Sequence, residues 1–298
     1  MVSKRFKILL LSHFDLDGFG CNIVVKNRFA GHDITTRNVG YNNINKIVKE
    51  LILSGEIYNY DALFITDISV DEEVAELIDN LNRDKIDIAL FDHHESTAHL
   101  LKYDWATIDK EHCGAYITNE MLSLNDDLDD LINLINDYDT WAWEAKGNVQ
   151  AKRLNDLMKL IGVDKFVSIF TENANIPNVF NVLEKYKELL DINQRQIDEY
   201  ISKKNKSMQK KIFKDKKVGI VFADMYLSEL GNELCKMNED VDYVMMINMA
   251  TVSLRTVKND IDLSKIAEQF GGGGHKKASG FICPGDKVQN FINNLLDI

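Results

Sequence analysis

Acidic residues and histidines gather at three places in the first third of the sequence. Carboxylates combined with imidazoles suit Mn²⁺, Zn²⁺ or Fe²⁺, whereas sites made only of oxygen ligands favour Mg²⁺ or Ca²⁺. A single Asp after a strand is often a helix cap, but capping does not explain two adjacent histidines after an Asp. The sequence therefore predicts a metal site built from three groups: His13 with Asp15 and Asp17, Asp67 alone, and Asp92 with His93 and His94.

Each of the three groups follows an apolar run that predicts a buried strand. The runs cover residues 6–11, 62–65 and 86–91, and helical patterns begin at Gly18 and cover residues 71–81. Strands that alternate with helices predict a mainly parallel sheet with ligands beyond the carboxyl ends of its strands. The three groups should therefore meet at one edge of an α/β domain.

The order and spacing of these groups resemble the first three motifs of the DHH phosphoesterase superfamily. His13-Phe14-Asp15-Leu16-Asp17-Gly18 is similar to the first motif, Asp67 to the second, and Asp92-His93-His94 to the motif that names the family. The resemblance covers essentially the whole chain. It implies an α/β enzyme with a smaller α/β substrate-binding domain and an active site in the cleft between domains. It also implies two bound Mn²⁺ ions, for which Mg²⁺ or other divalent ions could substitute.

The resemblance also implies a division of metal ligands. His13, Asp15 and Asp67 would hold one ion. Asp17, Asp67 and His93 would hold the other, so that Asp67 bridges the two. Alternate residues at an irregular strand end, such as Asp15 and Asp17, can aim at two ions ~3.5–4 Å apart.

Other roles follow for the rest of the third motif and for a fourth. His94 would face the scissile phosphate, and Asp92 would orient the histidines. The fourth family motif is an Asp at the end of a later helix, where Asp137 and Asp139 both occur. The family Asp stands two residues after the last apolar position of that helix, which favours Asp137 and leaves Asp139 open.

A second domain is expected in the last third of the chain. Residues 181–213 have a helical pattern without Gly or Pro, and residues 203–217 contain eight lysines. A strand pattern restarts at Val218. We therefore predict a catalytic domain over residues 1–180, a helical, lysine-rich linker over 181–217 and a substrate-binding domain over 218–298.

Gly271 to Gly280 is the strongest local signal in that second domain. Its glycines stand between an expected helix over residues 263–270 and an expected strand over 281–283, and glycines let backbone N–H groups approach an anion closely. The segment resembles the GGGGH loop of the DHH-associated domain, and the strand over residues 252–256 matches that domain as well. The resemblance implies a substrate-binding set of Ser253, Arg255, Gly272, Gly273, Gly274, His275 and Lys276.

Charge and composition limit the function classes. The formal net charge of −12 argues against a nonspecific binder of long duplexes, because such proteins present a large basic face. The four cysteines form no CxxC pair, which predicts reduced thiols. The apolar run at residues 8–11 is too short for a signal peptide or a membrane span. We expect a cytoplasmic protein without membrane contact, and a homodimer is compatible with the sequence.

The leading expectation is a metal-dependent phosphodiesterase that hydrolyses short single-stranded oligonucleotides or dinucleotides to mononucleotides, as nanoRNase-like family members do. A cyclic-dinucleotide phosphodiesterase would use the same core. A RecJ-type single-strand DNA exonuclease shares both motif sets, but those proteins are usually longer, and an acidic chain does not favour a long polymer. A nucleotide-binding regulatory protein is the non-enzyme alternative, and the retention of every charged motif argues against it.

Overall fold

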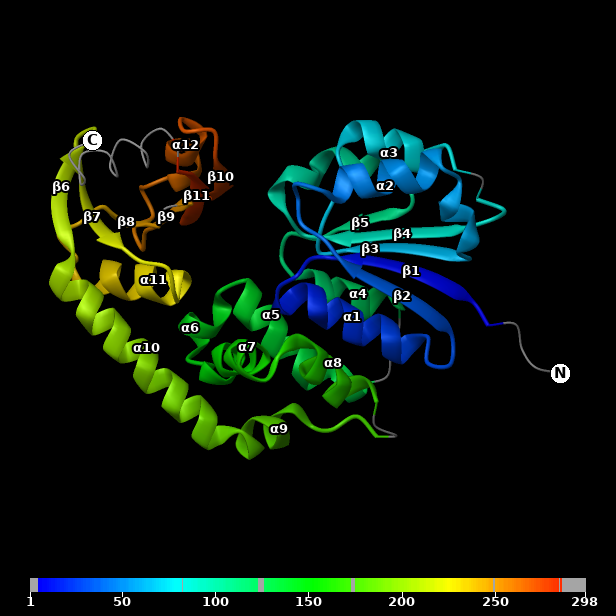
Figure 1. Cartoon of the computed structure of the whole chain (residues 1–298), viewed down its shortest axis with the longest axis horizontal. Helices are drawn as coiled ribbons and strands as arrows, with labels where there is room; N and C mark the ends of the chain where they lie inside the picture. The colour runs from blue at the N-terminus through cyan, green and yellow to red at the C-terminus, as the bar shows by residue number, and fades with distance from the viewer. Residues whose placement is uncertain are drawn as a thin grey trace. The chain divides into compact units, whose positions relative to one another are not determined.

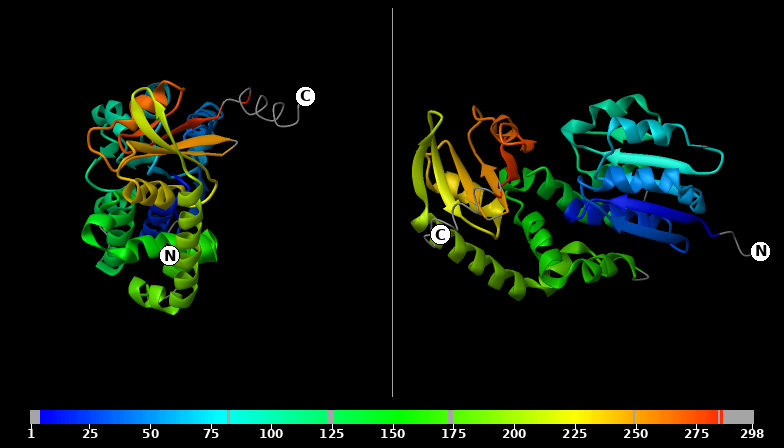
Figure 2. Two further views of the ribbon diagram at one scale, coloured as in Figure 1. Left: turned by 90° about the vertical axis from the view of Figure 1, so that its left-hand side faces the viewer. Right: turned by 45° about the horizontal axis from the view of Figure 1, so that its top comes forward.

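The computed structural model describes residues 5–81, 83–122, 126–172, 175–248, 250–283 and 285. The chain separates into two compact units, residues 1–190 and 191–298. Each unit has its own sheet (Figure 1). The boundary falls within α10 (Lys187–Ser207), which Figure 2 shows as one continuous helix.

The first unit is built on a five-stranded parallel sheet with the order β2-β1-β3-β4-β5. β1 lies between β2 and β3, so the strand order reverses at β1, and crevices open beyond the carboxyl ends of strands at such a switch point. The expected parallel sheet is confirmed. Its strands are β1 (Lys7–Ser12), β2 (Asp33–Asn38), β3 (Ala62–Thr66), β4 (Asp87–Asp92) and β5 (Ala106–Ile108).

Helices cover both faces of this sheet, as Figure 1 shows. Alternate residues of β1 explain this, because Leu9 and Leu11 belong to a different apolar cluster from Ile8 and Leu10. The first cluster contains residues of α2 (Ile44–Leu53) and α3 (Glu72–Asp79). The second contains residues of α1 (Leu16–Arg28) and α4 (Gly114–Leu122).

A further helical layer packs on α1 and carries the fourth candidate ligand. Its core joins α1 to residues of the later helices, with Phe166 and Phe170 among its fully buried side chains. The helices are α5 (Asp129–Asp139), α6 (Ala142–Lys146), α7 (Val149–Ile161), α8 (Val163–Thr171) and α9 (Val179–Lys185). Short 3₁₀ turns are η1 (Glu56–Asn59), η2 (Glu95–Lys102) and η3 (Asp126–Leu128).

The second unit is a six-stranded mixed sheet with the order β10-β11-β9-β8-β7-β6. β7 and β8 pair in parallel, and the other described pairs are antiparallel. The strands are β6 (Gln209–Phe213), β7 (Lys216–Phe222), β8 (Tyr243–Ile247), β9 (Thr251–Arg255), β10 (Gly273–His275) and β11 (Ala278–Ile282).

Two helices lie on opposite faces of this second sheet. α11 (Leu227–Met237) shares an apolar cluster with Val244 and Met246 of β8. α12 (Leu263–Glu268) shares another with Val252 and Leu254 of β9. Since successive strand residues alternate between faces, Ser253 lies on the face opposite to α12.

Two segments differ from the sequence prediction. Residues 209–213, expected to be helical, instead form β6, an exposed edge strand that pairs antiparallel with β7. The expected glycine loop is partly a strand, since Gly273–His275 pairs with β11. Lys210 and Lys217 both bond Asp240, and these hydrogen bonds lower the pKa of Asp240 to about 2. Part of the lysine-rich stretch is therefore already paired with acid.

All four cysteines are unpaired, and Cys21, Cys113 and Cys235 are buried. Within the described ranges, no helix combines the length and the apolar character that crossing a bilayer requires.

The β10–β11 hairpin yields a stability prediction. A Cβ at Gly272 would lie 2.1 Å from the carbonyl oxygen of Gly280, whereas a Cβ at Gly273 would meet nothing within 4 Å. Gly272→Ala should therefore lower the free energy of unfolding by about 1–3 kcal/mol. Gly273→Ala, the matched control, should change it by less than about 1 kcal/mol. Urea denaturation measures both, and equal stability of the two variants would contradict the close packing at Gly272.

Candidate metal centre

The end of β1 turns directly into α1 and carries the first group. Asp15 is the N-cap of α1, and its Oδ1 accepts the Gly18 amide at 3.0 Å. Its Oδ2 lies 2.7 Å from Nδ1 of His13. A Cβ at Gly18 would lie 2.2 Å from the His13 carbonyl oxygen, so this turn requires glycine. Asp15 therefore caps the helix and also faces the site.

Asp17 is held from the opposite side by the start of α4. It is 1% exposed, and its two oxygens accept the amides of Gly114 at 2.6 Å and Ala115 at 2.7 Å. Free amides at a helix N-terminus favour a negative charge. These two amides keep a buried carboxylate satisfied, and Oδ2 still lies 3.8 Å from Nε2 of His93.

Asp67 occupies the centre of the cluster. It follows β3 with a φ of 55°, in the left-handed region, and such strain in a non-glycine residue is typical of functional sites. Its Oδ1 lies 3.4 Å from Nε2 of His93, and its Oδ2 lies 3.9 Å from Nδ1 of His13. Asp67 is thus adjacent to both the first and the third group.

The third group is organised by the buried Asp92 at the end of β4. Oδ1 of Asp92 accepts the backbone N–H of His93 at 2.8 Å and lies 2.7 Å from Nδ1 of His94. Nε2 of His93 faces the carboxylates, and Nε2 of His94 lies 2.6 Å from the hydroxyl of Tyr41. The two neighbouring histidines therefore point to different partners.

Asp139, and not Asp137, lies in the cluster, although the spacing along the helix favours Asp137 and leaves Asp139 open. Oδ2 of Asp139 lies 3.5 Å from Nε2 of His93. The carboxylate of Asp137 instead binds Lys146 at 2.5 Å and Asn148 at 2.9 Å. Residues two positions apart in a helix are separated by about 200° of rotation, so only one of these two side chains can face the strand ends.

Burial and like charges dominate the electrostatics of the cluster. Burial and the charges of Asp17 and Asp15 raise the pKa of Asp67 and of Asp139 well above the ordinary value. Burial lowers the pKa of His93. Burial alone would raise the pKa of Asp15, but the hydrogen bond and charge of His13 outweigh it and lower that pKa to about 2.

Three buried polar atoms of the cluster have no hydrogen-bond partner among the described residues. They are Oδ2 of Asp67, Oδ2 of Asp92 and Nε2 of His93. Buried polar atoms are normally paired, and unpaired buried charge is costly. Ligand atoms within 4.8 Å of one another form three groups here: Asp67, Asp92, His93 and His94; His13, Asp15 and Asp67; and Asp17, His93 and Asp139. This set of oxygen and nitrogen donors fits divalent transition metals.

Four of the expected substrate residues of the second unit lie on one face of its sheet: Ser253, Arg255, Gly273 and His275. Directly paired strand residues project to the same face, and the register joins Arg255 to Ala278 and His275, and Ser253 to Gly280 and Gly273. Between Arg255 and the exposed His275 this face therefore carries only small residues.

The side chain of Arg255 is set against α11. Its guanidinium donates to the carbonyl of Leu254 at 2.9 Å and to the hydroxyl of Ser228 at 3.2 Å. A Cβ at Gly231 would lie 2.4 Å from Cγ of Arg255, so α11 packs directly on its aliphatic part. Gly274, with a φ of 132°, adopts a backbone conformation that other residues rarely reach. Lys276 is exposed in the turn that follows β10.

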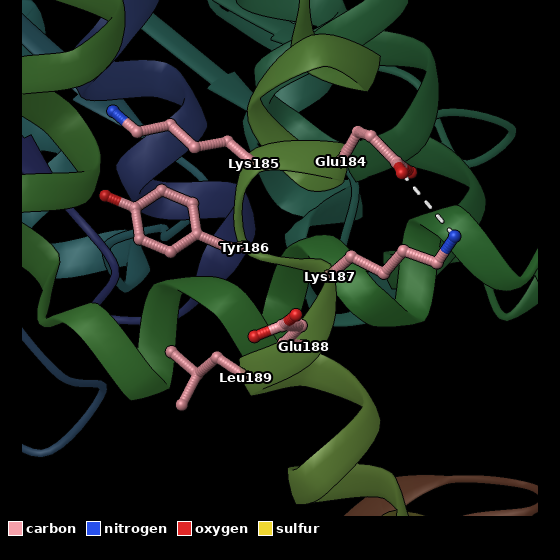
Figure 3. A pocket seen from close by; sticks show the side chains of 6 residues that line it. All are labelled: Glu184, Lys185, Tyr186, Lys187, Glu188 and Leu189. Atoms are coloured by element: carbon pink, nitrogen blue, oxygen red, sulfur yellow. Dashed lines mark hydrogen bonds and ion pairs between the residues drawn. The ribbon is translucent and has the colours of Figure 1, made fainter.

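Sequence reasoning missed the groups that reach the cluster from outside the motifs. These groups are Tyr41, Asn38 and the backbone amides at the start of α4. The side-chain amide of Asn38 donates to the carbonyl of His13 at 2.5 Å. A backbone amide has no sequence signature, and Tyr41 follows a strand too polar to predict. The open hollow in Figure 3, lined by residues 184–189 at the junction of α9 and α10, includes none of the cluster residues.

Comparison with known proteins agrees with this geometry. Residues 215–298 match the DHHA1 domain family. The chain is 37% identical to oligoribonuclease NrnB of Bacillus subtilis, over 95% of this chain and 74% of that protein. It is 26% identical to a 3′,5′-cyclic-nucleotide phosphodiesterase of Helicobacter pylori, over 91% of each. The chain therefore belongs to the DHH phosphoesterase superfamily and is a hydrolase.

The fold is also found in a solved structure of that superfamily. RecJ of Thermus thermophilus, solved in complex with Mn²⁺, superposes with a TM-score of 0.64 at 14% identity, over 96% of this chain and 51% of the RecJ chain. This likeness concerns the fold, and it agrees with the α/β architecture predicted from the sequence.

The raised pKa of Asp139 yields a prediction for the metal-free protein. The folded state binds more protons than the unfolded state between the ordinary and the raised pKa, so stability falls as pH rises through this window. For each unit by which folding raises this pKa, the free energy of unfolding above that window is lower by about 1.4 kcal/mol. Asp139→Asn removes this term while the histidines still titrate.

The measurement is the melting temperature of chelator-treated wild type and Asp139→Asn from pH 5 to pH 8. The melting temperature of Asp139→Asn should exceed that of the wild type by an amount that grows as pH rises. A constant difference, or one that shrinks, would show that Asp139 carries no raised pKa.

Proposed function

We propose that this protein hydrolyses short single-stranded oligonucleotides and dinucleotides to mononucleotides with the help of two divalent metal ions. The observation that carries the proposal is the cluster of buried carboxylates and imidazoles with unpaired atoms at a sheet switch point. The identity to an oligoribonuclease over nearly the whole chain supports the substrate class.

The proposed ligands divide into two sets that share Asp67. His13 and Asp15 would complete one set, and the ligand atoms of these three residues lie within 4.8 Å of one another. Asp17, His93 and Asp139 would complete the other, with Asp67 3.4 Å from His93. Bound divalent ions would supply Lewis acidity toward the phosphate and acidify a water molecule.

The protein residues would do the rest of the work at the phosphate. Asp92 fixes the orientation of His94 through Nδ1, which leaves Nε2 directed away from the buried carboxylate. Burial lowers the pKa of His94, but the hydrogen bond and charge of Asp92 outweigh it, and the pKa is raised above its ordinary value. A protonated His94 can donate to a phosphate oxygen.

The second unit would hold the nucleotide. Arg255 can grip a phosphate through two parallel hydrogen bonds, and Ala278, its partner on β11, is small. Lys210 and Lys217 are paired with Asp240, so they offer less charge to a long strand.

A cyclic-nucleotide phosphodiesterase is a second candidate, because a relative of that name is 26% identical over 91% of this chain. The same metal centre would serve both substrates. Purified protein with Mn²⁺, tested on RNA and DNA of two to twenty nucleotides and on cyclic nucleotides, separates the two. Turnover of cyclic nucleotides alone would replace the oligonucleotide proposal with this one.

The ligand assignment predicts which variant loses metal. Saturating Mn²⁺ should stabilise the wild type by about 2.7 kcal/mol at a hundred times Kd. Asp137→Asn should keep this gain, whereas Asp139→Asn should lose most of it. Melting temperatures with and without Mn²⁺ measure the gain. The opposite ranking of the two variants would restore Asp137 as the ligand.

Substrate length yields a second prediction. If Arg255 holds one nucleotide while the metal centre acts on a neighbouring phosphodiester, kcat/KM should be highest for about two to five nucleotides. Arg255→Ala should cost about 1.5–3 kcal/mol, the scale of a hydrogen bond to a charged group. Arg195→Ala, an exposed arginine on α10, is the control and should have no effect.

The decisive comparison is the rate per strand end on dinucleotides and on twenty-nucleotide single-stranded DNA. Faster degradation of the longer strand would overturn the short-substrate proposal in favour of a RecJ-type exonuclease.

A further inference from the structure

Tyr41 reaches the metal centre from a loop that no sequence motif marks. The loop joins β2 to α2 and is anchored at several points, since Val39 donates its amide to the carbonyl of Ser12 at 2.8 Å and Gly40 donates to Oδ1 of Asn43 at 3.0 Å. A Cβ at Gly40 would lie 2.8 Å from the ring of Phe14. The position of Tyr41 is therefore fixed by backbone contacts to the end of β1.

The ring of Tyr41 stands between two histidines of the site. Its centroid lies 5.2 Å from that of His13 and 5.4 Å from that of His94, with an interplanar angle of 79° to His94. Tyr41 is nevertheless 47% exposed. An aromatic residue that contacts two site histidines and still reaches solvent lies at the border between the cluster and the space from which a substrate arrives.

The hydroxyl of Tyr41 completes a chain of three side chains. Oδ1 of Asp92 lies 2.7 Å from Nδ1 of His94, and Nε2 of the same ring lies 2.6 Å from the hydroxyl oxygen of Tyr41. Nδ1–H donates to Asp92 in either protonation state. Nε2 of the neutral ring accepts the hydroxyl proton of Tyr41, whereas Nε2–H of the protonated ring donates to the hydroxyl oxygen. One hydrogen bond leaves a ring free to pivot, whereas bonds at both nitrogens fix its plane.

We propose that Tyr41 is a positioning residue that fixes the imidazole of His94 for contact with the scissile phosphate. This role rests on the proposed phosphodiesterase function and adds to it a residue outside the motifs. The hydroxyl bonds Nε2, and Asp92 bonds Nδ1. An arriving phosphate oxygen replaces the hydroxyl at Nε2, on an imidazole whose plane is already set before binding.

The first test is Tyr41→Phe, which keeps the ring and its packing and removes only the hydroxyl. With Mn²⁺ and a two-nucleotide RNA, kcat should fall about 10- to 100-fold, the range of one hydrogen bond to a charged group. KM and manganese content should stay within about twofold, because the proposed ligands are untouched. Tyr58→Phe is the matched control, since η1 precedes β3 and lies away from its carboxyl end.

A double variant tests whether Tyr41 acts through His94. In a His94→Ala background, Tyr41→Phe should cost less than about twofold, because residues that act as a unit are not additive. A full 10- to 100-fold loss in that background would overturn the positioning role.

A second readout does not depend on turnover. Imidazole ¹⁵N NMR of the metal-free protein should show the Nε2 resonance of His94 moving in Tyr41→Phe and not in Tyr58→Phe. An unchanged resonance, or loss of manganese from Tyr41→Phe, would overturn the role. A wild type without turnover on any phosphodiester would overturn the proposed function as well, whereas an active wild type with an unaffected Tyr41→Phe overturns the Tyr41 role alone.

Discussion

The burial of like charges at one edge of the first sheet is the constraint on which the rest of the site depends. Asp17 and Asp67 are each 1% exposed, and burial together with the charge of Asp17 raises the pKa of both Asp67 and Asp139. Such a group is stable only if protons or cations compensate it. The buried atoms of Asp67 and His93 without a hydrogen-bond partner among the described residues belong to a cluster that could hold such a cation.

The fold holds this charge in place with rigid elements. β1 and β3 are almost completely buried and adjacent, so their carboxyl ends cannot separate. The amides that begin α4 satisfy both oxygens of Asp17, while the left-handed backbone of Asp67 turns its carboxylate toward the histidines. The strain and the repulsion are thus tolerated because the core around them is extensive and cohesive.

The parts of this structure that sequence predicts well are those that are fully buried. β1, β3 and β4 are apolar runs, and the groups that follow them do meet at one edge. The sequence does not predict the edge strands, because a strand with a neighbour on one side only needs fewer apolar residues. These strands are β2, β5, β6 and β10. β8 is also not predicted, although it is a central and apolar strand.

The sequence alone does not decide between Asp137 and Asp139, for a different reason. Spacing along α5 cannot reveal where a helix ends relative to the strands it faces, and the side chain that binds Lys146 and the one that faces His93 differ by two residues. Tyr41 was missed because only the tertiary fold brings its loop to His94. Motif residues are thus visible in sequence, whereas the groups that orient them are not.

In the proposed mechanism, two ions share Asp67 at the carboxyl edge of the first sheet. Anomalous diffraction at the manganese edge from crystals soaked in Mn²⁺ would locate them. We expect two peaks about 3.5–4 Å apart, with Asp67 between them, His13 and Asp15 beside one, and Asp17, His93 and Asp139 beside the other. The absence of manganese from this edge, or a single peak that does not contact Asp67, would contradict this mechanism.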